Sequence, residues 1–261
     1  MTYDINKLRE KYKQLSEKQQ KTEEGNKDSY LKIAEGSNMI RILPGKGEGE
    51  PFYVETALHV LKNNGQLKYY HCLKVHNESC PLCDAYYKVW DRVNAGEKHL
   101  EPLGKGSNSI RPKPRYYMNA VNRKDDTVKI YSAPEKVFTL IMTNMLGNDE
   151  LGIDALGDVT DVNEGYDFNV VAGKQAEFLE FSQSRFRPKS TPAGTPQKIA
   201  EYMDLRHDLN SLVKKEDYAE LKLVADSLLA NGASNVEPVE VQPKKMAMSD
   251  EEFKAKINSK V

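Results

Sequence analysis

The sequence predicts an α+β protein whose core is a small, OB-fold-like antiparallel barrel, with helical segments at both ends of the chain. Three observations predict this class. Short apolar runs separated by turn residues recur between residues 39 and 181, with helical patterns at 84–95 and 134–146 among them. Amphipathic periodicity marks the beginning and the last third of the chain. One histidine and three cysteines lie within residues 59–83, which predicts a metal site.

The first expected element is a basic amphipathic helix over residues 1–24. Up to residue 22 it carries six basic and three acidic residues. Residues 25–28 begin with a glycine and interrupt the pattern, so this helix is expected to be an appendage. It either packs as a solvated helix on its own domain or serves as an arm that binds a neighbouring molecule. Its apolar stripe consists of Ile5, Leu8, Tyr12 and Leu15.

The core is expected over residues 25–235. Strands are assigned where short apolar runs are bounded by turn residues, and helices where apolar residues recur at three- and four-residue steps. Trp90 lies in the helix that follows the cysteines and is expected in the core. The expected strands are residues 39–44, 52–61, 66–73, 116–121, 127–131, 166–172 and 175–181. The expected helices are residues 84–95, 134–146, 196–212 and 215–229.

The predicted metal ligands are His59, Cys72, Cys80 and Cys83. Cys80 and Cys83 have the Cys-x2-Cys spacing of a zinc knuckle, and one imidazole with three thiolates is a complete tetrahedral set. Because the protein fills all four positions, none is open for substrate, and one structural Zn²⁺ is expected. Two alternatives are unliganded buried thiols and a disulfide; an odd cysteine count and a reducing compartment disfavour the latter.

The choice of histidine rests on strand geometry. His71 adjoins Cys72, and neighbouring side chains on a strand point to opposite faces, so His71 should face away from the metal. His59 lies on a strand that can return antiparallel to the Cys72 strand across a turn at residues 62–65. His59 is therefore favoured, and His76 remains the alternative ligand.

Composition narrows the class of protein further. The chain has 261 residues, a formal charge of -1 and 39% hydrophobic residues. No apolar run approaches membrane-spanning length and the N-terminus does not resemble a signal peptide, so a cytoplasmic protein without membrane contact is expected. The acidic residues between 149 and 161 match no calcium loop and have no accompanying base, so catalysis is not expected.

Two local stretches are strongly basic although the whole chain is not. Residues 102–124 contain six basic residues and no acid, and residues 181–200 contain four basic residues and no acid. Cations interleaved with aromatic residues at a sheet edge are typical of a groove for single-stranded nucleic acid, because cations neutralise phosphates and rings stack on unpaired bases. The candidate residues are Arg111, Lys113, Arg115, Tyr116, Tyr117, Phe178, Phe181, Arg185 and Phe186.

Strand alternation requires some of these aromatic residues to be buried. Side chains on a strand point alternately to the two faces, so Tyr116 and Tyr117 cannot both face the same side. At least half of the five aromatic candidates are expected to be exposed.

Four features, in order, resemble the single-stranded DNA-binding, helix-destabilising proteins of T-even-type phages. The resemblance covers roughly residues 38–190. The features are Ile40-Arg41-Ile42-Leu43-Pro44, the His59, Cys72, Cys80 and Cys83 set, Asp158-Val159-Thr160 followed by Glu164-Gly165 and Phe168, and Phe178-x2-Phe181-x2-Ser184-Arg185-Phe186.

The resemblance implies an OB-fold core with an inserted zinc subdomain at about residues 59–96, and a cleft between them that binds single strands. It implies that Arg41 contacts DNA, that Tyr116 and Tyr117 form an aromatic pair in the cleft, and that Phe178 and Phe181 stack on bases. It also implies a protein of the infected bacterial host's cytoplasm that coats and protects unpaired DNA, without sequence preference, in phage replication, recombination and repair.

The resemblance further implies partners beyond single-stranded DNA. These are neighbouring copies of the protein, bound cooperatively through the N-terminal arm, and replication and recombination proteins. The flexible tail expected over residues 236–261 is charge-balanced, with five acids and five lysines, whereas family members usually end in an acidic tail. The alternative functions are a zinc-stabilised adaptor that binds protein partners, and binding of RNA in place of DNA.

Overall fold

The computed structural model describes residues 29–63, 66–106, 109–175 and 178–231. The predicted arm at 1–24 and tail at 236–261 lie outside the described residues. The strands are β1 (Gly36–Ile42), β2 (Tyr53–Asn63), β3 (Gln66–His71), β4 (Lys113–Asn122), β5 (Thr127–Pro134), β6 (Asp167–Gln175), β7 (Phe178–Glu180) and β8 (Arg185–Phe186). The α-helices are α2 (Pro81–Asn94), α3 (Glu101–Gly104), α4 (Glu135–Leu146), α5 (Pro196–Asp204) and α6 (Tyr218–Asn231).

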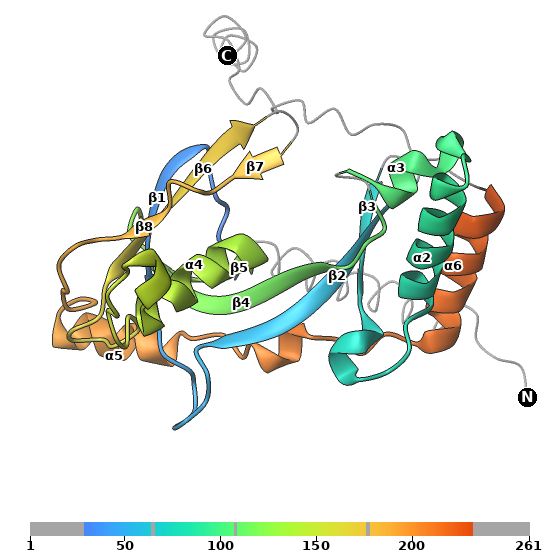
Figure 1. Cartoon of the computed structure of the whole chain (residues 1–261). Coiled ribbons are helices and arrows are strands. Elements are labelled where there is room, and N and C mark those ends of the chain that lie inside the picture. The colour runs from blue at the N-terminus through green and yellow to red at the C-terminus, as the bar shows by residue number, and fades with distance from the viewer. Residues whose placement is uncertain (1–28, 64–65, 107–108, 176–177, 232–261) are drawn as a thin grey trace, which may run out of the picture.

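These strands form one antiparallel sheet, so the predicted α+β class is confirmed. The order is β3-β2-β4-β1-β6-β7, with β5 paired to β4 and β8 paired to β6. Ile42 pairs with Ala120 and Tyr53 pairs with Met118, so β1 and β2 follow one another along the same edge of β4. β5 pairs along the other edge of β4, and the long β2 and β4 ribbons curve across the molecule in Figure 1.

The described residues have two large apolar cores, one on each side of the molecule. The first lies between the sheet and α4 and contains Ile40, Met118 and Phe168. The second lies around α2 and includes Leu221 and Ala225 of α6, so α6, the last described helix, packs beside α2 (Figure 1). The zinc subdomain that the resemblance implies at about residues 59–96 therefore shares its apolar core with residues from 100 to 110 and with α6.

Most predicted elements are present, with one clear exception. The helix expected at 196–212 ends at Asp204, and only a short 3-10 turn, Asn210–Leu212, follows it. The reason is a tertiary contact: the buried Asn119 side chain accepts a hydrogen bond from the His207 amide at 2.8 Å and donates one to the His207 carbonyl at 3.0 Å. The Asn119 side chain of β4 thus occupies the amide and carbonyl groups of His207, which a continued helix would need for its own hydrogen bonds. Within the described ranges, no helix has the length and apolar character needed to cross a membrane.

Candidate metal centre and nucleic-acid interface

The four predicted metal ligands lie together in the second core. His59 is on β2 and pairs with Tyr70 of β3, and Cys72 follows the end of β3. Cys80 is the N-cap of α2, and Cys83 lies in its first turn. One donor atom from each of the four lies within 4.8 Å of the others, and all four residues are buried. His76 is not part of this group of described residues.

The distances between donor atoms fit a tetrahedral ion. The His59 Nε2 atom lies 3.4 Å from Cys80 Sγ and 3.6 Å from Cys83 Sγ, and Cys72 Sγ lies 3.5 Å from Cys83 Sγ. Ligand bonds of about 2.0 to 2.3 Å around zinc place neighbouring donors roughly 3.5 to 3.8 Å apart. These residues could therefore hold one metal ion, and three sulfurs with one imidazole suit a soft or borderline ion.

A backbone contact fixes the orientation of the His59 ring. The Nδ1 atom lies 2.7 Å from the carbonyl oxygen of Ile110, so the Nδ1–H donates there and Nε2 is left to face the thiols. Burial alone would lower the pKa of His59, but hydrogen bonds with Cys72 and Cys80 raise it to about 9. The ring is thus tied to the segment that precedes β4.

The thiols of Cys80 and Cys83 differ in proton affinity. Hydrogen bonds with Cys72 and Cys83 lower the pKa of Cys80, whereas hydrogen bonds with Cys72 and Cys80 raise the pKa of Cys83. The cluster itself therefore favours a thiolate at Cys80 and disfavours a second thiolate at Cys83. A bound cation would remove this conflict, because it stabilises every thiolate that coordinates it.

A groove of about 610 Å³ lies between α2 and the start of β4 and is called the basic groove below. Its walls come from α2, residues 104–106 and 109–115, and residues 134–136. Five cationic side chains and one carboxylate, Glu135, line it. The cations are Lys105, Arg111, Lys113, Arg115 and Lys136.

Three predicted nucleic-acid residues, Arg111, Lys113 and Arg115, meet in the basic groove. Partial burial is the main cause that lowers the pKa of Lys113 and of Arg115, and for Lys113 the nearby Arg115 charge lowers it further. The two cations therefore share a poorly solvated space. An anion bound there would relieve both effects, which makes the groove a favourable place for a phosphate.

Tyr116 and Tyr117 point to opposite faces of β4, as alternation requires. Tyr116 is half-buried and stacks on Phe138, with ring centroids 3.8 Å apart and an interplanar angle of 4°. Tyr117 is 4% exposed and packs edge-on against Tyr30 at 6.1 Å, and burial raises its pKa. The expected aromatic pair in the cleft is therefore wrong for Tyr117, which is a core residue.

Arg41 does not lie on an open surface. Its side chain has 0% exposure, and its Nη2 donates to the carbonyl oxygens of Asp161 at 2.8 Å and Thr191 at 2.7 Å. Its Nη1 lies 3.4 Å from Asp167 Oδ1. Gly165 makes this enclosure possible, because a Cβ at that position would lie 2.9 Å from Arg41 Nη2. The expected contact with DNA is corrected here: Arg41 ties β1 to the loops around it.

Of the candidates near β7 and β8, the described side chains of Phe181, Arg185 and Phe186 do not line the basic groove. Phe186 is 8% exposed and packs on Phe168 with ring centroids 4.7 Å apart, so it belongs to the first core. Phe181 is half-buried against the same core, whereas Arg185 is exposed. Phe178 pairs through its backbone with Gln175, and its side chain lies outside the described part of the structure. None of the four described aromatic candidates is fully exposed, contrary to the expectation.

Two aromatic groove residues are absent from the candidates that the sequence indicates. Trp90 and Tyr86 of α2 line the basic groove and are half-buried, whereas the sequence predicts Trp90 in the core. They lie four residues apart, on one edge of the buried stripe of α2 that contains Val89 and Val93. Two large aromatic residues at the margin of such a stripe are the signal that could have indicated them.

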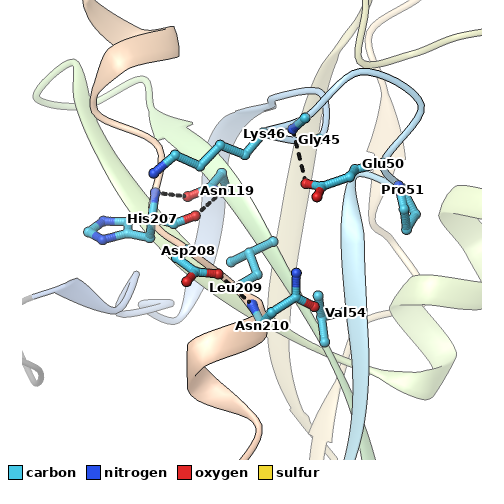
Figure 2. A pocket seen from close by; sticks show the side chains of 11 residues that line it. Gly45, Lys46, Glu50, Pro51, Val54, Asn119, His207, Asp208, Leu209 and Asn210 are labelled. Atoms are coloured by element: carbon cyan, nitrogen blue, oxygen red, sulfur yellow. Dashed lines mark hydrogen bonds between the residues drawn. The ribbon is translucent and has the colours of Figure 1, made fainter.

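A second cavity, of about 560 Å³, lies where the β1–β2 loop meets residues 207–210 (Figure 2). Lys46 extends along it toward His207, and the carboxylates of Glu50 and Asp208 also line it. Its charges are mixed, and it contains none of the predicted nucleic-acid residues. It offers a cation, Lys46, that is exposed and away from the basic groove.

Comparison with known families gives one match. A family model described as "gp32 DNA binding protein like" matches residues 34–230. The matched range contains the metal cluster and every residue that lines the basic groove. The match confirms the resemblance to the helix-destabilising proteins of T-even-type phages. A comparison with curated proteins found no match.

Proposed function

The chain belongs to the family of gp32-like DNA-binding proteins, and on this premise we propose that it binds single-stranded DNA in the basic groove without sequence preference. The observation that carries the proposal is the composition of the groove: five cations and one carboxylate share a space of about 610 Å³ with Tyr86 and Trp90. Cations bind the continuous phosphate backbone, and rings accept unpaired bases of any kind.

The mechanism is binding and not catalysis. A protein that binds unpaired strands and not duplex shifts the melting equilibrium toward single strands by mass action. Lys113 and Arg115 supply positive charge at a poorly solvated wall of the groove, where a contact with a phosphate is stronger than in bulk water. The half-buried rings of Tyr86 and Trp90 give the groove an aromatic wall beside these cations.

We propose zinc as the ion held by His59, Cys72, Cys80 and Cys83. The support is the donor set, its burial and donor separations that fit a tetrahedral ion. Bound zinc would supply folding free energy rather than reaction chemistry, because protein side chains fill its four positions. The residues themselves hold α2 against β2 and fix the start of the segment that leads to Arg111.

Finer features of the proposal rest on the family. They are an OB-type barrel formed by the antiparallel sheet, cooperative binding of neighbouring copies through residues 1–24, and docking of replication and recombination proteins. On this account the protein coats unpaired phage DNA during replication, recombination and repair in the cytoplasm of an infected bacterium. The arm at residues 1–24 lies outside the described residues.

Salt dependence tests this function against its alternatives. The affinity for an oligo-dT strand is measured at several salt concentrations. DNA binding predicts a straight fall of log affinity against log salt, with a slope of about -0.7 for each phosphate contacted. A salt-insensitive complex would favour an adaptor that presents its aromatic residues to a protein. Tighter binding of an RNA strand of the same sequence would favour RNA as the ligand.

A further inference from the structure

The single tryptophan of the chain lies beside the cations of the basic groove. We propose that Trp90 is a base-stacking residue, whose indole ring receives one unpaired nucleobase while Lys105 contacts the phosphate of that nucleotide or the next. This inference rests on the proposed function and adds to it a specific subsite.

The position of Trp90 on α2 leaves part of its ring outside the core. Val89, one residue earlier, is fully buried, and Val93 is nearly so, whereas Trp90 is half-buried. One edge of the indole is supported from below: an added Cβ on Gly104 would lie 3.7 Å from Trp90 Cε3, an ordinary packing distance. The ring is therefore held in place on one side and borders the groove on the other.

A cation accompanies the exposed part of the ring. The Lys105 Nζ atom lies 5.7 Å from the ring centroid of Trp90, and it also pairs with Glu101 at 3.1 Å. Cation–π attraction of this kind is modest at an exposed site, about 0.5 to 1 kcal/mol. Lys105 can therefore leave the ring for a phosphate at little cost, because a phosphate replaces both weak contacts with a stronger one.

Tyr86 extends the aromatic surface along the helix. Its ring centroid lies 6.2 Å from that of Trp90, with an interplanar angle of 36°. Both rings line the groove together with Arg111 and Lys113. A ligand that fits must carry regularly spaced negative charge and flat apolar rings, and a single nucleic-acid strand has both. Duplex DNA does not fit, because its bases already stack on one another.

The fluorescence of Trp90 reports on this subsite directly, because no other tryptophan contributes. Zinc-loaded protein is titrated with oligo-dT and with an abasic sugar–phosphate strand of equal length, while anisotropy of a label on each strand measures binding. The expected result is quenching of Trp90 and reduced access of acrylamide to it with oligo-dT, and no quenching with the abasic strand. Binding by anisotropy with unchanged Trp90 emission and access would overturn the inference.

A pair of substitutions gives a second test. Trp90→Ala should weaken oligo-dT binding about 5- to 150-fold, which corresponds to one stacked base at about 1 to 3 kcal/mol. The same substitution should change the affinity for the abasic strand by less than about 3-fold, because that strand has no base to stack on the ring. Tyr87→Ala is the matched control: Tyr87 is on the same helix and 56% exposed, but does not line the groove.

The outcomes separate two failures. Equal effects of Trp90→Ala on both strands, with native circular dichroism, would assign Trp90 a packing role and overturn the stacking inference alone. Recovery of most of the lost affinity in Trp90→Phe would support stacking, because a smaller ring still offers a face. Absence of binding to either strand by folded, zinc-loaded wild-type protein would instead overturn the proposed function itself.

Discussion

His59 and Ile110 join the metal cluster to the basic groove through one hydrogen bond of 2.7 Å, from the imidazole Nδ1 to the main-chain carbonyl oxygen. Ile110 is fully buried, and its own amide donates to the Leu103 carbonyl at 3.0 Å. The next residue, Arg111, is exposed and lines the groove. A ligand of the metal cluster therefore determines the position of the chain immediately before a groove cation.

Loss of one thiolate should affect stability and binding together. Cys80→Ser is expected to lower the free energy of unfolding by roughly 2 to 5 kcal/mol, the upper range for a single substitution, because the metal set is incomplete. DNA affinity should fall as well, because the His59–Ile110 link loses its anchor. Chemical denaturation, zinc content and strand binding are the measurements.

A histidine control belongs with that experiment. His76 is near in sequence but outside the four-residue cluster, and its Nε2 has no hydrogen-bond partner among the described residues. His76→Asn should keep its zinc, whereas His59→Asn should lose it. A normal zinc content in His59→Asn would reverse this assignment.

Removal of a groove cation should change the salt dependence of binding. Arg111→Ala is expected to reduce the slope of log affinity against log salt by roughly 0.7, the contribution of one phosphate contact on a single strand. Lys46→Ala, which removes an exposed cation from the second cavity, should leave the slope unchanged. Equal changes in the two variants would indicate a diffuse charge effect and no defined groove.

Arg41 should matter for stability and not for contact with DNA. Arg41→Met removes the Arg41 donor from the Thr191 carbonyl, and the Asp161 carbonyl keeps only the Gly165 amide at 2.9 Å, while Asp167 retains Arg123 at 2.8 Å. A loss of about 2 to 4 kcal/mol in the free energy of unfolding is expected from broken buried polar contacts. A stable variant with weak DNA binding would restore the family-based expectation that Arg41 contacts the strand.

The two neighbouring tyrosines of β4 should behave differently. Tyr116→Ala removes a ring that stacks on Phe138 and is half-exposed, so both stability and strand affinity should fall, the latter by about 1 kcal/mol or more if one base stacks there. Tyr117→Leu should lower stability only, because the Tyr117 ring lies in the core against Tyr30. Titrations of each variant into labelled strand held well below Kd, with denaturation curves for each variant, distinguish the two.

Local patterns predicted the elements and the metal cluster well. Cys80 and Cys83 are fixed by a Cys-x2-Cys turn that leads into a helix, and Pro81 takes the first helical position, where its missing amide hydrogen costs nothing. His59 reaches the thiols because β2 and β3 pair across a short turn, which the two apolar runs indicate. These are short-range relationships, so the sequence contains them.

Contacts between residues far apart in the sequence determine the features that local patterns did not predict. The burial of Arg41 depends on loops more than a hundred residues later, and the end of α5 depends on Asn119 of β4. Strand alternation showed that Tyr116 and Tyr117 face opposite sides of β4. It did not show which of the two is buried, because that depends on which elements cover each face of the sheet. Trp90 resembles a core residue by spacing, and only the fold shows that part of its ring borders the groove that segment 104–106 forms beside α2.

Single-strand binding in the basic groove can be measured by anisotropy titration of zinc-loaded protein with labelled oligo-dT and with a duplex of equal length, at two salt concentrations. We expect tighter binding of the single strand and a steep loss of affinity at the higher salt. Equal affinity for strand and duplex, or no binding to either by folded and metal-loaded protein, would contradict this expectation.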